Sequence, residues 1–147
     1  RMTLQLPHLC GRGLADLAFD AETHEWVFSF SGQCSLRVAA PWRMISESQI
    51  VAGCGDDGHW FGLEMPFDGR ERDMRAIAGH VVSEASASEF GDLSVRFGSD
   101  SMLQVFNHSA GYEGWQLFGP GERIVVAQGG GGVLDSEKGE ISFWRYG

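Results

Sequence analysis

Apolar and polar residues alternate with a period of two along most of the chain, which is the pattern of strands that bury one face. The clearest case is 25–31, where Trp26, Phe28 and Phe30 fall on one face. A second alternating segment, 34–40, follows after a short turn. The 21 glycines and 4 prolines separate such segments, which favours tight hairpins. The chain is therefore predicted to be mainly β.

The same reasoning predicts further strands, which are shorter or less regular: 14–19, 49–54, 81–86, 93–97, 103–108, 114–118, 124–128 and 141–146. One segment breaks the alternation. Asp68 precedes Glu71 by three residues, which is the spacing of a helix N-terminal capping box. Apolar residues then recur on one helical stripe, at Met74, Ile77 and Ala78. We expect one short α-helix at 69–78.

Two parts of the chain, 11–45 and 79–117, share an order of features. Each has a glycine with a basic residue, a strand, an acidic turn, an alternating hairpin and then a tryptophan. A duplicated β-meander would leave this pattern, although two generic hairpins can also align by chance. The fold expected is a single domain, 1–147, of two pseudo-repeated antiparallel meanders that form a partial barrel or a sandwich.

The net charge of the chain limits the classes of partner that it is expected to bind. The chain has 147 residues and a formal net charge of -9. An acidic chain of this kind disfavours binding to a phosphate backbone, so no nucleic acid is expected, whereas a basic protein partner fits. There is no apolar stretch of about 18 residues, so no membrane span is expected. The odd number of cysteines, 3, and the lack of a CxxC motif favour reduced thiols and a cytoplasmic location.

Candidate catalytic and metal sites are weak. Asp56, Asp57 and His59 lie within one predicted turn, where they could bind a divalent cation or supply a general base. Neighbouring side chains diverge in such a turn, however, and the histidines show no zinc-binding spacing. Ser109 follows His108 without the GxSxG elbow of a hydrolase. We therefore predict no catalytic residue, no metal site and no cofactor.

Aromatic residues at predicted strand ends are more informative: Trp42, Trp60, Tyr112, Trp115, Trp144 and Tyr146. Such residues form either an exposed rim at an interface or plugs at the ends of the core. A carboxylate beside them, Glu113, could accept a guanidinium group. The candidate binding residues are Trp42, Arg43, Asp56, Asp57, His59, Trp60, Tyr112, Glu113 and Trp115.

A run of short motifs also resembles a family of small bacterial proteins of unknown function. The motifs are Pro41-Trp42-Arg43, Asp56-Asp57-Gly58, Phe61-Gly62, Gly91-Asp92-Leu93, the segment 112–116 and a late Gly-Gly pair. The resemblance covers nearly the whole chain and implies a fold type rather than a mechanism. The chain is also similar to immunity proteins of bacterial polymorphic toxin systems, without a diagnostic residue string.

These observations favour a noncatalytic, immunity-like protein-binding module that uses an acidic surface with an aromatic rim. The first alternative is a small-ligand-binding β-barrel, lined by Phe28, Phe30, Phe97 and Phe106. The second is an enzyme in which the fold brings His59 or His108 to Asp56 and Glu113. A homodimer is compatible with all three functions.

Overall fold

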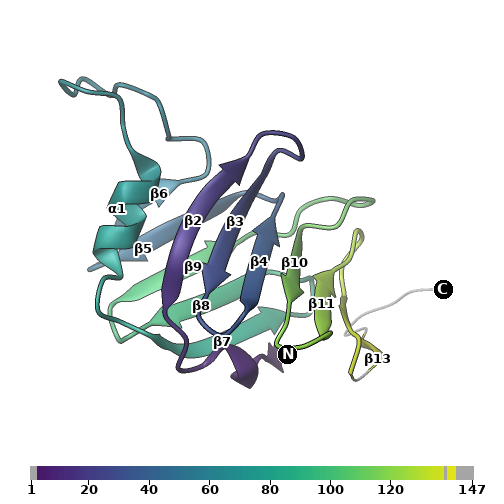
Figure 1. The fold of residues 1–147 in the computed structure, drawn as a ribbon. Coiled ribbons are helices and arrows are strands. Elements are labelled where there is room, and N and C mark those ends of the chain that lie inside the picture. Colours follow the sequence, from purple (N-terminus) through teal and green to yellow (C-terminus); the bar gives the residue numbers. More distant parts are fainter. Residues whose placement is uncertain (1–2, 138, 142–147) are drawn as a thin grey trace.

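The computed structural model describes residues 3–137 and 139–141, which form two antiparallel sheets and one short α-helix (Figure 1). The six-stranded sheet contains, in spatial order, β1 (Thr3–Gln5), β7 (Val82–Ser88), β8 (Leu93–Phe97), β9 (Ser101–Val105), β5 (Trp42–Ser46) and β6 (Gln49–Gly53). The seven-stranded sheet contains β13 (Gly139–Ile141), β12 (Val133–Asp135), β11 (Ile124–Ala127), β10 (Trp115–Phe118), β4 (Cys34–Val38), β3 (Glu25–Phe30) and β2 (Leu14–Asp20). A 3-10 turn, η1 (Pro7–Leu9), and the helix α1 (Gly69–Ala76) complete the fold. The predicted mainly β class is confirmed.

The two sheets pack against each other around a shared core, so the fold is a sandwich without barrel closure. Alternation along the strands explains the core, because Trp26, Phe28 and Phe30 of β3 are all buried. Phe30 stacks on Phe97 of the other sheet, with ring centroids 6.3 Å apart and planes 6° from parallel. This pair joins the two layers where β3 and β8 end.

The predicted repeat segments have matching topology. β2, β3 and β4 form one meander, and β7, β8 and β9 form the other. After each meander the chain crosses to the opposite sheet, so that β5 pairs with β9 and β10 pairs with β4. Trp42 begins β5 opposite Val105, and Trp115 begins β10 opposite Val38. A duplicated meander would produce this arrangement, and the duplication itself stays a prediction.

Several predicted boundaries differ from the structure. Strands β1, β5 and β12 were not predicted: β1 and β12 have three residues each, and β5 directly follows Pro41. β9 ends at Val105, so the predicted strand 103–108 is too long and its last residues belong to a loop. The predicted strand 141–146 begins where β13 ends, and residues 142–146, with Trp144 and Tyr146, lie outside the described residues.

The helix is confirmed, but its predicted buried stripe is partly wrong. The Asp68 carboxylate accepts a hydrogen bond from the Glu71 amide at 3.0 Å, as the capping spacing predicts. Ile77 is buried, whereas Met74 is only partly buried and Ala78 is exposed. The other buried positions of α1 are Gly69 and Asp73. In the described part of the chain, no helix is long and apolar enough to cross a membrane.

Candidate functional site

Two of the predicted site residues, Trp42 and Trp115, belong to the core rather than to a surface rim. Trp42 is 3% exposed and packs edge-on against Trp26 and Phe28, with ring centroids 5.4 Å and 5.1 Å away. Trp115 is 1% exposed, and its indole Nε1 donates a hydrogen bond to the Gly91 carbonyl at 2.6 Å. The prediction of an exposed rim is wrong for both tryptophans, because their partners on the opposite sheet enclose them.

Arg43 lies on the outer side of the six-stranded sheet. Its Nε donates a hydrogen bond to Gln104 Oε1 at 2.8 Å, across the pair of β5 and β9. Its guanidinium carbon lies 5.3 Å from the centre of the Phe106 ring. Phe106 is itself exposed, so it does not join Phe28 and Phe30 between the sheets, as the ligand-barrel alternative expected.

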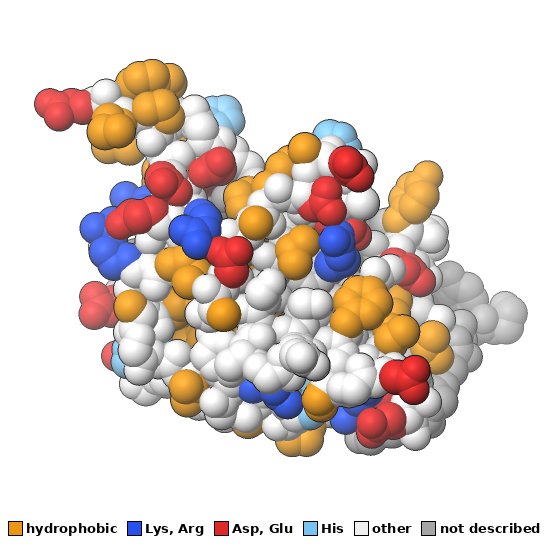
Figure 2. Space-filling model, in the orientation of Figure 1, with side chains coloured by type: hydrophobic (Ala, Val, Ile, Leu, Met, Phe, Trp, Pro, Cys, Tyr) orange, Lys and Arg blue, Asp and Glu red, His pale blue; other side chains and the backbone are white. Residues whose placement is uncertain are grey.

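Four large apolar side chains gather on the connection between β6 and α1. We call residues 59–67 the apolar loop. Trp60 is 56% exposed and Met65 is 73% exposed, with Phe61 and Leu63 similarly uncovered. Figure 1 shows this connection extending away from the sandwich, and Figure 2 shows hydrophobic side chains at its tip with an acidic side chain beside them. Contiguous exposed apolar surface of this kind typically marks an interaction site.

The ends of the apolar loop are fixed. The Gly58 amide donates to the Phe67 carbonyl at 2.8 Å, and the Phe67 amide donates to the His59 carbonyl at 2.6 Å. Asp57 Oδ1 accepts from the Gly69 amide at 2.9 Å, which ties the loop to the start of α1. Asp56 Oδ2 accepts from the Gly53 amide at 2.8 Å. The two predicted carboxylates therefore hold backbone in place.

Ring contacts order the interior of the loop. Phe61 has a φ of 48°, which turns the chain back, and its ring lies 5.5 Å from those of His59 and Phe67. The Arg72 guanidinium lies 4.8 Å from the centre of the Phe67 ring. His59 thus stacks on an aromatic ring rather than meeting an acid. Within residues 3–137 and 139–141, no group of three His, Cys, Asp or Glu side chains could hold a metal ion.

The remaining predicted residues, Tyr112 and Glu113, lie on the β9–β10 loop. Figure 1 draws this loop, the β2–β3 turn and the apolar loop along the upper edge of the view. Tyr112 is 83% exposed. A cleft of about 400 Å³ separates the β9–β10 loop from the β2–β3 turn. Its lining includes His24, His108, Tyr112 and Glu113. The last three were named in the enzyme or binding hypotheses, and the structure brings them together.

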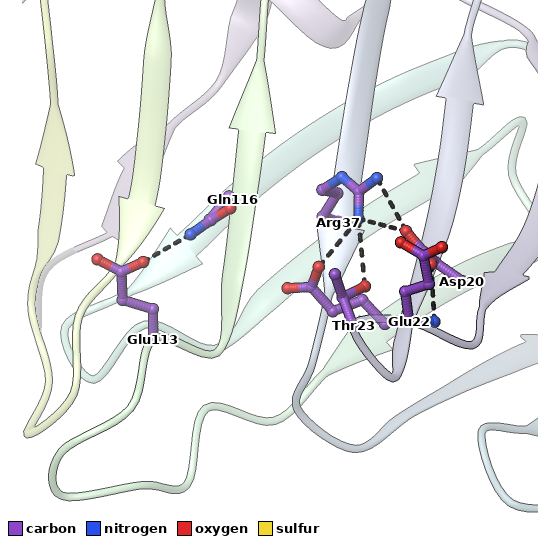
Figure 3. Close-up of polar contacts among 7 residues, drawn as sticks. Asp20, Glu22, Thr23, Arg37, Glu113 and Gln116 are labelled. Atoms are coloured by element: carbon purple, nitrogen blue, oxygen red, sulfur yellow. Dashed lines mark hydrogen bonds and ion pairs between the residues drawn. The ribbon is translucent and has the colours of Figure 1, made fainter.

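Glu113 lines this cleft, and further acidic residues lie close in sequence to its lining residues Thr23 and His24. Figure 3 shows Arg37 pointing toward Asp20 and Thr23 on one side, and Glu113 reaching Gln116 on the other. Arg37 pairs with Glu25 at 3.0 Å and with Asp20 at 3.2 Å. The backbone amide of Glu22 lowers the pKa of Asp20, and Arg37 lowers it further. We call Asp20, Glu22, Glu25, Arg37 and Glu113 the acidic end. It contains four carboxylates and one guanidinium, which pairs with Asp20 and Glu25, so its formal charge is negative.

Glu113 Oε1 accepts a hydrogen bond from Gln116 Nε2 at 2.6 Å, which fixes the carboxylate on the sheet face. Gln116 of β10 lies directly opposite Arg37 of β4 in the strand register. The position of Gln116 opposite Arg37 was not predictable, because it depends on which strands become neighbours.

The sequence analysis missed Phe61, Leu63 and Met65 as surface residues. A usable signal was present, since 59–67 is apolar but follows neither the strand nor the helix period and comes after an Asp-Asp-Gly turn. It also missed Asp73, which occupies a helix position that faces the core. Burial raises the pKa of Asp73 to about 8, the negative charge of Asp56 adds to this rise, and Arg72 opposes it.

Comparisons with known proteins identify a family but no activity. Neither a curated protein nor a solved structure matches the chain. A family model described as a family of unknown function, DUF6188, matches residues 6–136, which include α1, the apolar loop and every strand except β1 and β13 at the edges of the two sheets. The chain therefore belongs to the DUF6188 family of unknown function.

Proposed function

We propose that this protein is a noncatalytic protein-binding module whose recognition element is the apolar loop. The observation that carries the proposal is the exposure of Trp60, Phe61, Leu63 and Met65 on a loop with fixed ends. A loop that is ordered before binding loses less conformational entropy on association. Tryptophan in particular contributes strongly at the centre of an interface.

The charge of the loop and of the whole chain indicates which class of partner fits. The segment 56–68 contains Asp56, Asp57, Glu64 and Asp68 but no lysine or arginine. These carboxylates would be repelled by an anionic membrane surface. A second copy of the chain would carry the same net charge of -9. A protein with an apolar pocket and a basic border complements both properties of the loop. An immunity-like role, in which the bound protein is a toxin, is one form of this function.

The test compares the affinity of the wild type with that of W60A/M65A for the protein that the wild type captures from an extract of its own cells. Truncation of a central interface tryptophan typically costs at least about 2 kcal/mol, so we expect affinity to fall at least about 30-fold. The matched control is I50A/V81A, which removes two exposed apolar side chains outside the loop and should leave affinity unchanged. Equal retention by all three proteins, including retention of nothing, contradicts the proposal.

A further inference from the structure

A carboxyl group occupies the core-facing stripe of α1. Asp73 lies one helical turn from Gly69 and one from Ile77, both of which are buried. Its side chain is 0% exposed, and neither carboxyl oxygen has a hydrogen-bond partner in the part of the chain that the structure describes. A neutral carboxyl is tolerated in such a place, whereas an ionised one loses its water without replacement. The site therefore discriminates between the two protonation states.

The charges around Asp73 do not compensate for ionisation. α1 packs on β6 and β2. β6 has no ionisable side chain. β2 contributes two aspartates that are each paired with an arginine: Asp16 with Arg70 and Asp20 with Arg37. Asp56, which follows β6, repels a second negative charge, and Arg72 of α1 attracts one. Arg72 is also engaged elsewhere, since its Nε donates to the Val51 carbonyl at 3.0 Å.

The position of α1 sets the position of the apolar loop. Asp57 accepts a hydrogen bond from the first amide of the helix, that of Gly69. About one helical turn after Gly69, the Arg72 guanidinium packs on the ring of Phe67, the last residue of the apolar loop. A displacement of α1 from the sheets would break both contacts. The loop would then lose the order that the backbone hydrogen bonds at its ends provide.

We propose that Asp73 is a pH-sensitive switch that controls the apolar loop. With its proton in place, α1 stays docked on β6 and β2 and holds the loop. When the proton passes to solvent, the carboxylate is drawn toward water, α1 moves away from the sheets and the loop is released. The consequence for partner binding rests on the proposed function, but the movement of α1 does not.

The electrostatics of Asp73 set the pH range in which the switch operates. Burial raises the pKa of Asp73 in the docked form to about 8 from the ordinary value of 3.8, with Asp56 adding to the effect. Between these two values the docked form keeps a proton that the released form has lost, so each pH unit increases the ratio of released to docked protein about tenfold. Above about pH 8 both forms are ionised, and the ratio no longer changes.

Hydrogen exchange of the full chain between pH 5 and 9.5, corrected for the intrinsic pH dependence of exchange, tests the switch without a partner. In the wild type, amides 69–77 should lose protection as the pH rises toward about 8 and lose no more above it, while β3 and β8 keep theirs. D73N has no ionisable group at this position and should keep α1 protected throughout. Protection of α1 that is independent of pH in the wild type, or an equal pH response in D73N, overturns the proposal.

A second variant covers the case in which D73N does not fold. D56N removes the neighbouring charge but keeps an oxygen acceptor for the Gly53 amide, so the pH at which the loss of protection stops should become lower. The control, E84Q, changes an exposed acid on β7 and should leave that pH unchanged. An unchanged value in D56N also overturns the proposal. Failure of W60A/M65A to lose a partner would instead contradict the proposed function and leave these exchange results intact.

Discussion

At the scale of single residues, two aromatic side chains three positions apart have opposite roles. Trp115 is enclosed between the sheets and bonds to the Gly91 carbonyl, while Tyr112 projects from the β9–β10 loop. Both residue types combine a large apolar surface with one polar group. The difference is therefore one of position, since Trp115 begins a central strand and Tyr112 precedes it.

This difference predicts unequal effects on stability. Trp115→Ala should lower the free energy of unfolding by about 3–5 kcal/mol, because it leaves a large cavity in the core. Tyr112→Ala should change it by less than about 0.5 kcal/mol, since the side chain has little packing to lose. Urea unfolding of both variants checks the contrast. Similar losses in the two variants would contradict the placement of Trp115 in the core.

The same residues show how far the sequence could predict the molecule. The alternation of residues was enough to predict the burial of Phe28 and Phe30, because the two faces of a strand follow from its own sequence. It could not orient Trp115, whose enclosure depends on Gly91, 24 residues earlier in the chain. The cleft between His24 and Glu113 likewise depends on two loops that only the sheet order brings together.

At the scale of elements, the predicted start of α1 is confirmed, whereas its buried face differs from the prediction. The Asp68 cap was predictable, since it depends on residues three apart. The placement of Asp73 toward the core was not, because a polar residue at that position normally points to solvent. As a result, the helix is stabilised by its cap and by Ile77 but only while Asp73 keeps its proton.

The pH dependence of stability follows from this buried acid. The pKa of Asp73 is about 8 in the folded state against 3.8 when unperturbed, so between these values the folded state binds the extra proton. Its contribution to stability is present below about pH 4 and is lost as the pH rises toward 8, at up to about 1.4 kcal/mol per unit. Relative to the wild type, D73N should therefore gain stability across this range in urea unfolding. A constant difference would contradict the burial of an ionisable Asp73.

At the scale of the whole molecule, the sandwich places three loops along one edge (Figure 1). The apolar loop provides hydrophobic contact, and the acidic end provides an electronegative field next to the cleft. With a net charge of -9, the protein should attract a basic partner before the two surfaces touch. Affinity would then depend on the loop, and the association rate on the charges.

Charge reversal tests this division of roles. E113K should lower the association rate constant for the captured partner several-fold at low salt and weaken its dependence on ionic strength. E84K, on β7, which is four strands away from β6 in the six-stranded sheet, is the control and should change the rate far less. Stopped-flow mixing or surface plasmon resonance measures both. Equal effects of the two substitutions would show that only the net charge matters.

The most direct test of the central claim is site-specific photo-cross-linking. A benzophenone amino acid is placed at Leu63 in the apolar loop or, as the control, at Ile50 on β6, which is at least as exposed. The account predicts a cross-link to the basic partner from position 63 and none from position 50. Cross-linking from position 50 alone, or from neither position, would contradict the assignment of the apolar loop as the binding surface.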